Sequence, residues 1–377
     1  MSETPPHSPP ILRLLQSLFR MLGDPARAER FVRLGKRIVW ACVLLYTVGL
    51  ALSLCWLDFH GDFWWPTWLL LYLPPALFLL PLLLLVPLGL LFDWRTLYAA
   101  LACVVMVFGF YDDFEWQQPR APREPGRELR IVCNNIGGRG NHRLTPFVEQ
   151  HDPDLILLQE AQRRGEGYAK QYGERNLHTA FHGEFVCSSR SPILESGLVD
   201  DVLCDGRPVA ARFVTEAHGR RIVIYNVHIA SPRSLLDKLK GRGGIAQLLH
   251  DLGFGMGRDY GAVEKVCNRL VAAEALLKRI GAETDPVIVG GDFNIPARGQ
   301  AYHRFAKQFQ DSFEKRGRGY GFTFPGRTRN PFSLFGPWLR LDLVFASRDW
   351  QVLDSRTEPG NPPQHRAVFA SLELREP

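Results

Sequence analysis

The chain has few cysteines, seven in 377 residues, and no two of them form a Cys-x-x-Cys pair. It also has no cluster of cysteine and histidine, which disfavours a dedicated zinc site and a thioredoxin-like redox centre. Scattered cysteines of this kind are most often buried free thiols, and a disulfide stays open only for a domain outside the cytoplasm. No internal repeat is visible, so a solenoid of stacked repeats is not indicated.

Positive charge is scarce between residues 38 and 126, which hold three Lys/Arg against seven Asp/Glu. The first 37 residues hold seven Lys/Arg against three Asp/Glu, and residues 127–377 hold 35 against 29. The C-terminal part is therefore basic. A basic surface suits a polyanionic or phosphorylated ligand, although many basic surfaces serve only solubility.

Long apolar stretches fill the first third of the chain, at about residues 38–57, 67–92 and 96–111. The first two reach the roughly 20 residues that a helix needs to cross a bilayer, and the third is marginal. Prolines at four positions of the second stretch predict kinks, which membrane helices tolerate. We predict a transmembrane region over residues 38–111 with three helices. The alternative is a buried helical hairpin of a soluble protein.

The distribution of charge predicts the sidedness of this region. Five Lys/Arg between residues 27 and 37 place the basic N-terminal segment, residues 1–37, in the cytoplasm. The connection after the first stretch carries Asp58 and Asp62 and no Lys or Arg, which suits the outer side. Three crossings then put the C-terminal domain outside the cytoplasm. If the third stretch only dips into the bilayer, the domain is cytoplasmic instead.

Residues 112–128, rich in proline and arginine, are expected to be a linker, and residues 129–377 a single α/β domain. Short β-branched runs predict strands at 129–136, 154–159, 185–188, 207–215, 221–229, 286–292, 340–346, 350–355 and 366–374. Helical patterns cover residues 143–151, 166–176, 261–281 and 299–309. Adjacent strands with intervening helices indicate two packed sheets flanked by helices.

Polar side chains stand at six ends of these predicted strands. In VIVGGDFNIP, Asp292 and Asn294 are two residues apart, so the period-two alternation of a strand directs both to one side. The same rule pairs Asn226 with His228. The other members of the set are Asn135, Glu160, Asp342 and His365. Each alone could be a turn, a helix cap or a surface charge, but these readings do not explain all six strand ends in one domain.

The motifs LRIVCNNI, DLILLQE, YNVH, GGDFN, RLDLVF and QHRAV, in this order, resemble the endonuclease/exonuclease/phosphatase superfamily with its deoxyribonuclease I-like fold. The resemblance covers residues 129–374 and suggests a membrane-anchored bacterial member. It implies a four-layer α/β/β/α sandwich, with two packed mixed sheets flanked by helices. It also implies hydrolysis of phosphoester bonds with a divalent metal ion.

The resemblance implies a metal site at Glu160, the main ligand, with Asn135 beside it. Carboxylate and amide oxygens are the hard ligands that Mg²⁺ prefers, and Mn²⁺ is the alternative ion. One departure bears on this site. The family usually has an aspartate before its last histidine, and this chain has Gln364 there, which puts a second metal ion in doubt.

The same resemblance implies the catalytic residues. Asp292 and Asn294 match the pair that positions the attacking water and the scissile phosphate. His228 matches a phosphate-contacting histidine, and His365 matches the catalytic histidine that Asp342 orients. The general base is His365 or Asp292. Two further residues are expected at the substrate: Asn226 and Arg190.

We therefore expect a membrane-anchored, Mg²⁺-dependent phosphoesterase whose substrate is a phosphorylated lipid or a nucleic acid. An apolar segment at residues 331–338 could contact lipid or pack locally, and we find no aromatic and basic platform for nucleic acid. The alternatives are an extracytoplasmic endonuclease on DNA or RNA and a non-catalytic membrane-bound binding domain. No protein partner can be inferred.

Overall fold

A computed structural model of the chain describes residues 23–62, 65–111, 114–124, 126–138, 144–231, 261–327, 336–362 and 364–376. The described residues form two compact units, of which one lies within Met1–Leu54 and Pro75–Asp112 and the other within Cys55–Pro74 and Asp113–Pro377. Most of the apolar segment 331–338 lies outside the described residues.

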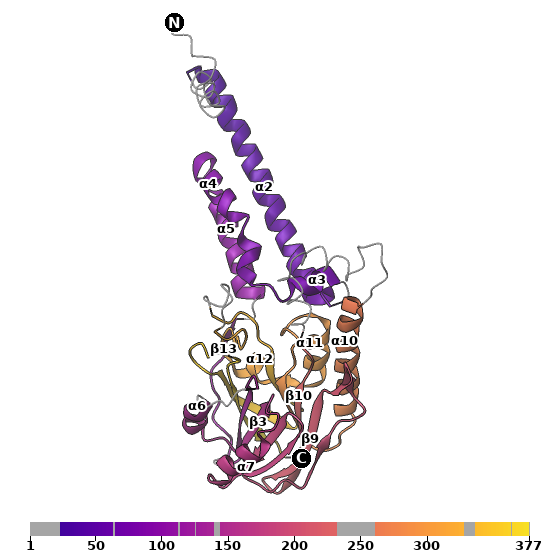
Figure 1. The fold of residues 1–377 in the computed structure, drawn as a ribbon. Coiled ribbons are helices and arrows are strands. Elements are labelled where there is room, and N and C mark those ends of the chain that lie inside the picture. The colour runs from indigo at the N-terminus through magenta and orange to yellow at the C-terminus, as the bar shows by residue number, and fades with distance from the viewer. Residues whose placement is uncertain are drawn as a thin grey trace. The chain divides into compact units, whose positions relative to one another are not determined.

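The first unit consists of apolar helices (Figure 1). They are α2 (Pro25–His60), which continues into the second unit, η1 (Pro75–Leu79), α4 (Leu82–Phe92), α5 (Thr96–Val105) and the π-helical turn η2 (Met106–Tyr111). Ala26–His60 and Pro75–Phe92 are long and apolar enough to cross a membrane, and the apolar helix Thr96–Gly109 is shorter. Large apolar side chains of the long helices are exposed, for example Leu45 at 77% and Leu83 at 75%.

The sequence predicted one helix over the second apolar stretch from residue 67, but the structure does not form it. The short helix α3 (Trp65–Leu70) ends, and helical structure resumes only at Pro75. Pro74 and Pro75 lack a backbone N–H, and a proline ring disfavours the helical conformation of the residue that precedes it. The two prolines therefore break the stretch, and the candidate span begins at Pro75.

The second unit contains two mixed sheets of six strands each. One sheet has the order β15 (Trp350–Thr357), β16 (Val368–Leu374), β2 (Glu128–Asn135), β3 (Leu155–Gln159), β5 (Phe185–Ser189) and β4 (His178–His182). The other has the order β12 (Gln310–Asp311), β14 (Asp342–Ala346), β11 (Val287–Asp292), β10 (Arg220–His228), β9 (Ala210–Ala217) and β6 (Glu195–Leu198). Two small ribbons pair β1 (Glu115–Trp116) with β13 (Arg318–Gly319), and β7 (Leu203–Cys204) with β8 (Arg207–Pro208).

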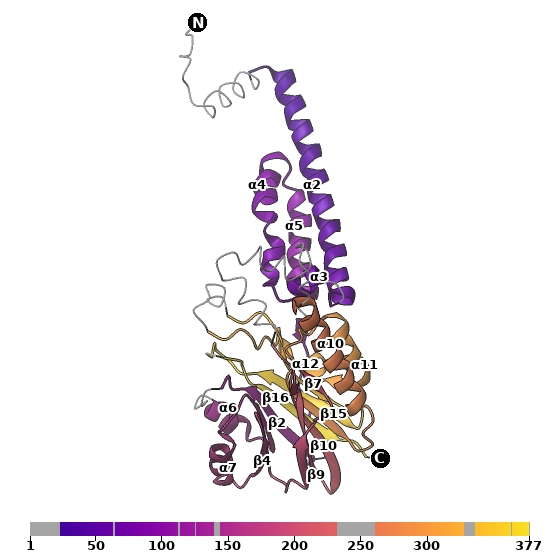
Figure 2. The ribbon, with the colours of Figure 1, turned by 45° about the vertical axis from the view of Figure 1, so that its right-hand side comes forward.

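The four predicted layers are present (Figure 2). Alternate residues of each strand face opposite sides, so Ile131 and Cys133 lie in the core between the sheets while Val132 faces the helices. Helices α6 (Leu144–His151) and α7 (Gly165–Gly173) cover the β2 sheet. Helices α10 (Gly261–Ile280) and α11 (Gly299–Gln308) cover the β10 sheet, and the short α12 (Ser312–Arg316) follows β12.

Each sheet has one parallel pair at its centre, β2 with β3 and β10 with β11. Asn135 pairs with Gln159 at the end of the first pair, and His228 pairs with Asp292 at the end of the second. Because parallel strands end at the same edge, each pair delivers two polar residues to one edge of its sheet.

All predicted strands and helices of this unit have counterparts. The strands β1, β4, β6, β7, β12 and β13 and the helix α12 were not predicted. The predicted linker is partly bound to the unit. Its residues form β1, and the Arg120 amide donates to the Leu353 carbonyl at 2.7 Å.

Candidate active site

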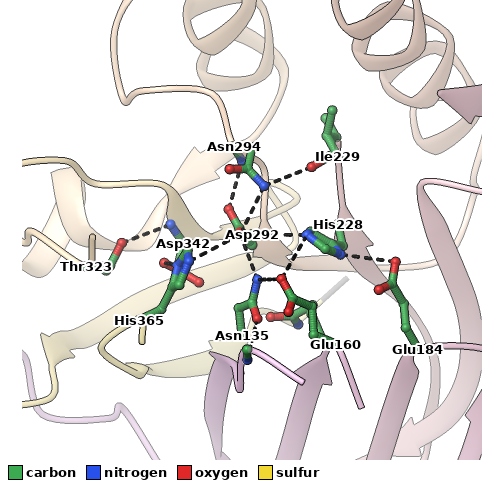
Figure 3. Close-up of polar contacts among 12 residues, drawn as sticks. Asn135, Glu160, Glu184, His228, Ile229, Asp292, Asn294, Thr323, Asp342 and His365 are labelled. Atoms are coloured by element: carbon green, nitrogen blue, oxygen red, sulfur yellow. Dashed lines mark hydrogen bonds and ion pairs between the residues drawn. The ribbon is translucent and has the colours of Figure 1, made fainter. Parts of the chain in front are cut away.

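Seven of the nine predicted site residues lie together where the central parallel strands end (Figure 3). Most of them are buried, and Glu160 is the exception, with a third of its side chain exposed. The site is therefore an inward-facing polar cluster that is open to solvent at Glu160.

Asp292 is the centre of the cluster. It is 1% exposed, and its Oδ2 accepts hydrogen bonds from the Asn135 amide at 2.9 Å and the Asn294 amide at 3.1 Å. The Asn135 amide also donates to Glu160 Oε1 at 3.1 Å. Burial raises the pKa of Asp292, and the nearby Asp342 carboxylate adds to this, against the opposing effect of His365. A buried carboxylate with a raised pKa is better suited to accept a proton near neutral pH.

Asp342 and His365 form a buried pair beside it. His365 Nδ1 lies 2.7 Å from Asp342 Oδ2, and His365 Nε2 lies 3.7 Å from Asp292 Oδ2. Burial lowers the pKa of His365, but Asp342 and then Asp292 outweigh it and raise that pKa to about 9. The Thr323 hydroxyl, which sequence reasoning missed, accepts from the Asp342 amide at 3.2 Å and fixes the start of β14. His365 is thus held as an imidazolium facing the centre of the site.

His228 is held by a carboxylate that sequence reasoning also missed. Its Nδ1 lies 3.1 Å from Glu184 Oε1, and its Nε2 lies 3.7 Å from Glu160 Oε1. Burial lowers the pKa of His228, and the three carboxylates of Glu184, Asp292 and Glu160 together raise it above the ordinary value. Glu184 follows Gly183, which has a φ of +58°, in the tight turn between β4 and β5. A Gly-Glu turn signal between two strands was available, but β4 was not predicted.

The residues present fit a hard divalent cation. Asp342 Oδ1 is buried and has no hydrogen-bond partner among the described residues, and carboxylates surround the site. The oxygen of the Asn135 amide accepts from the Gly137 amide at 2.9 Å, so its nitrogen faces Glu160 and Asp292 and orients these carboxylates instead of ligating the cation. Ligand atoms of Asp292, Asp342 and His365 also lie within 4.8 Å of one another. An imidazolium has no free lone pair, which makes the carboxylates the better ligands of this group.

Two predicted substrate residues lie elsewhere. Asn226 is fully buried where the two sheets meet: its amide donates to the carbonyls of Leu158 and Val186, and its oxygen accepts from Gln159 at 2.7 Å. All its polar atoms are thereby used inside the protein.

Arg190 follows β5, which runs antiparallel to β3. It therefore lies at the beginning of β3, where its Nε is 2.8 Å from Asp154. Glu160 follows the other end of β3, about 20 Å away at roughly 3.3 Å per residue. The antiparallel direction of β5 thus places Arg190 at the opposite end of β3 from Glu160.

Gln364 and Asn134 have structural roles beside the site. The side chain of Gln364 lies against Gly137, where an added Cβ would stand 2.3 Å from the Gln364 Cδ. The amide of Asn134 donates to the His365 carbonyl at 3.2 Å. Asn134 thereby ties β2 to the backbone of His365.

An aromatic and basic cluster, which the sequence did not reveal, forms at the ribbon of β1 and β13. Phe114 and Trp116 are exposed and stack on each other, Tyr320 contacts the Phe114 ring at 4.9 Å, and Arg318 lies 5.0 Å from the Trp116 ring. The next ring, Phe322, stacks on Tyr320 at 5.0 Å. The members of this aromatic cluster come from segments about 200 residues apart in the chain.

The chain is similar to several solved structures and matches one family model. The chain is similar to an endonuclease/exonuclease/phosphatase from Bacteroides vulgatus (18% identity, TM-score 0.46, covering 66% of this chain and 99% of that one). It is also similar to a 3'-5' exonuclease from Neisseria meningitidis (15%, 0.45, 66% and 100%) and an AP endonuclease from Archaeoglobus fulgidus (16%, 0.45, 64% and 98%). No curated protein matches the chain. The model of the Endonuclease/Exonuclease/phosphatase family matches residues 135–363, more than half of the sequence, and the chain belongs to this family.

Proposed function

We propose that the chain is a membrane-anchored, Mg²⁺-dependent phosphoesterase that cleaves a phosphodiester or phosphomonoester bond by in-line attack of an activated water. The observation that carries this proposal is the convergence of Asp292, the Asp342–His365 pair and Glu160 at one edge of the two sheets. His365 can donate a proton and Asp292 can accept one, and the solvent-exposed carboxylate of Glu160 lies beside them. This arrangement suits proton transfer during hydrolysis of a phosphate ester.

A Mg²⁺ ion held by Glu160, with Asn135 beside it, would polarise the phosphoryl oxygen and neutralise developing charge. Asn294 and Asp292, linked at 3.1 Å, would orient the attacking water. The imidazolium of His365 would donate a hydrogen bond to a phosphoryl oxygen, since Asp342 keeps Nδ1 occupied and leaves Nε2 facing the site. His228, whose Nδ1 lies 3.1 Å from Glu184, would contact a second phosphoryl oxygen.

Of the two candidate bases, the electrostatics favour Asp292. The pKa of His365 is raised to about 9, so its imidazole is protonated and donates a hydrogen bond at neutral pH. The raised pKa of Asp292 gives that carboxylate more affinity for the water proton than an exposed aspartate has. Asp292→Asn should then abolish turnover.

We propose that the helices Ala26–His60 and Pro75–Phe92 cross the membrane, because their large apolar side chains are exposed, unlike those of a buried hairpin. Residues of the connection between them contact the C-terminal domain, as in the bond from Tyr72 to Asn294. The connection and the C-terminal domain must then lie on the same side of the membrane. The chain therefore crosses the membrane an even number of times between Pro75 and Tyr111. This supports a third crossing by Thr96–Tyr111, and the basic N-terminus puts the domain outside the cytoplasm.

The test uses the full chain purified in detergent. Hydrolysis of bis(p-nitrophenyl) phosphate, a DNA oligonucleotide and phospholipid vesicles is measured with Mg²⁺ and with a chelator. We expect activity that the chelator and Asp292→Asn both remove, and the preferred substrate would separate lipid from nucleic acid. Equal rates for Asp292→Asn and the wild-type chain would refute the scheme.

The aromatic cluster favours a second candidate, an extracytoplasmic nuclease. Exposed rings beside an arginine are a stacking platform for single-stranded bases, each worth about 1–3 kcal/mol. Trp116, 66% exposed, is the most accessible of these rings. If DNA or RNA is the substrate, binding should weaken with salt and should fall about 10-fold in Trp116→Ala, corresponding to about 1.4 kcal/mol. Unchanged binding in this variant would leave the lipid as the better candidate.

A further inference from the structure

The segment Cys55–Pro74, which we term the connector, belongs to the same compact unit as the catalytic site, although it connects two apolar helices. The hydroxyl of Tyr72 donates to the Asn294 carbonyl at 2.9 Å. Arg269 of α10 donates both to the same carbonyl and to the Tyr72 hydroxyl, the latter at 3.2 Å. Tyr72 and Arg269 are 8% and 4% exposed, so these bonds are sheltered from water.

The backbone of Asn294 is held on several sides. Its φ is +48°, in the left-handed region that asparagine adopts more readily than most non-glycine residues. Its side chain is fixed by the Ile229 carbonyl at 2.9 Å and by Asp292. Its carbonyl accepts hydrogen bonds from Tyr72 and Arg269. The orientation of the Asn294 amide against Asp292 thus depends on both sets of contacts.

The connector is itself firmly attached to the domain. Asp62, 4% exposed, accepts from the Ala301 amide at 3.0 Å in the first turn of α11, where the N-cap residue Arg298 provides no side-chain cap. Gly299, with a φ of +77°, leaves room for this carboxylate, since a Cβ there would stand 2.5 Å from it. The indole of Trp338 donates to the Tyr72 carbonyl at 3.1 Å. The connector therefore presents Tyr72 to Asn294 from a fixed position.

Trp68 completes this arrangement. Its ring lies 5.0 Å from the Tyr72 ring, and the Arg269 guanidinium lies 5.4 Å from the Trp68 ring. A cation above a buried tryptophan face is stabilised and kept in place. Arg269 is thereby held by the connector as well as by its own helix.

We propose that the connector is a working part of the catalytic site and that Tyr72 is a positioning residue, which with Arg269 holds the Asn294 backbone. This inference rests on the proposed function, because it assigns Asn294 a role in orienting water and phosphate. Tyr72 contacts neither the attacking water nor the phosphate, and it acts through the Asn294 carbonyl. The anchor to the membrane and the geometry of hydrolysis are then coupled through one short segment.

The test compares Tyr72→Phe with Tyr225→Phe in the full chain in detergent. The control also removes one buried hydroxyl from the same unit, since Tyr225 donates to Glu283 at 2.7 Å. With bis(p-nitrophenyl) phosphate and Mg²⁺, we expect kcat to fall about 3- to 10-fold in Tyr72→Phe, the loss of one hydrogen bond, with KM and melting temperature matching the control. Hydrogen exchange of peptides covering residues 290–298 should become faster in Tyr72→Phe alone.

Exchange and kcat equal to those of Tyr225→Phe would overturn the positioning role. A wild-type chain that leaves this phosphodiester intact would count against the proposed function only. The exchange measurement needs no substrate, and it would still decide whether Tyr72 holds the backbone around Asn294.

Discussion

Replacing Asp342 by asparagine tests the electrostatics of the site most directly. The substitution removes a carboxylate 2.7 Å from His365 Nδ1 and keeps the shape of the side chain. Burial lowers the pKa of His365, and Asp342 is the largest of the opposing influences that bring it to about 9. In Asp342→Asn burial remains while the main opposing charge is gone, so the pKa should fall well below 9.

The raised pKa also predicts how stability depends on pH. The folded chain holds the His365 proton more tightly than the unfolded chain, in which a histidine has its ordinary pKa of 6.5. The difference from about 9 corresponds to roughly 3 kcal/mol at 1.36 kcal/mol per unit. This stabilisation is complete below pH 6.5 and is lost as the pH rises through about 9. For a domain of this size the loss amounts to about 6–12 °C in melting temperature.

The assay is an NMR titration of labelled histidines in metal-free full chain, with His365→Ala to assign the resonance, together with melting curves from pH 6 to 10. Asp342→Asn should lose most of the decline in melting temperature over this range. Asp349→Asn, a change at an exposed aspartate of the same domain, is the matched control. A wild-type midpoint at or below 6.5, or one that Asp342→Asn leaves unchanged, would refute the reasoning.

Three further changes test other parts of the structure. Glu160→Gln should weaken Mn²⁺ binding about 10- to 100-fold in calorimetry while leaving the melting temperature of the metal-free chain nearly unchanged, because this side chain is a third exposed. Asp311→Ala removes the buried carboxylate that lies 2.5 Å from Arg340 Nη1, and should cost about 3–5 kcal/mol in the free energy of unfolding. Asn226→Ala should cost about 2–4 kcal/mol by removing two buried hydrogen bonds, to the carbonyls of Leu158 and Val186, with KM unchanged in the folded fraction. A raised KM at unchanged stability would return Asn226 to the substrate site.

The strands of the C-terminal domain could be predicted because their residues follow local rules. Short β-branched runs located β2, β10 and β11, and the polar residues at their ends marked the site. Prediction failed where the outcome depends on a partner strand. β4 is a half-exposed edge strand next to β5 and carries few strong β-formers, so its composition did not distinguish it from a loop.

Site residues supplied by distant segments could not be predicted from local patterns. Glu184 reaches His228 only because the turn after β4 lies beside the end of β10, and Tyr72 reaches Asn294 from 222 residues away. The aromatic cluster likewise exists only after β1 pairs with β13. Arg190 shows the reverse case, since its motif suggested the substrate but antiparallel pairing carried it to the far end of β3.

The role of Asn226 follows from how the site is assembled. Each sheet supplies one parallel pair, and neither pair alone contains both Glu160 and Asp292, so the site exists only when the sheets are aligned face to face. The core between them is largely apolar, and apolar contacts are non-directional, so they tolerate small shifts of one sheet over the other. Asn226 adds directional bonds from β10 to Leu158 and Val186 close to the strand ends that carry the site. A polar side chain buried between apolar layers thus fixes the sheets where the alignment matters for catalysis.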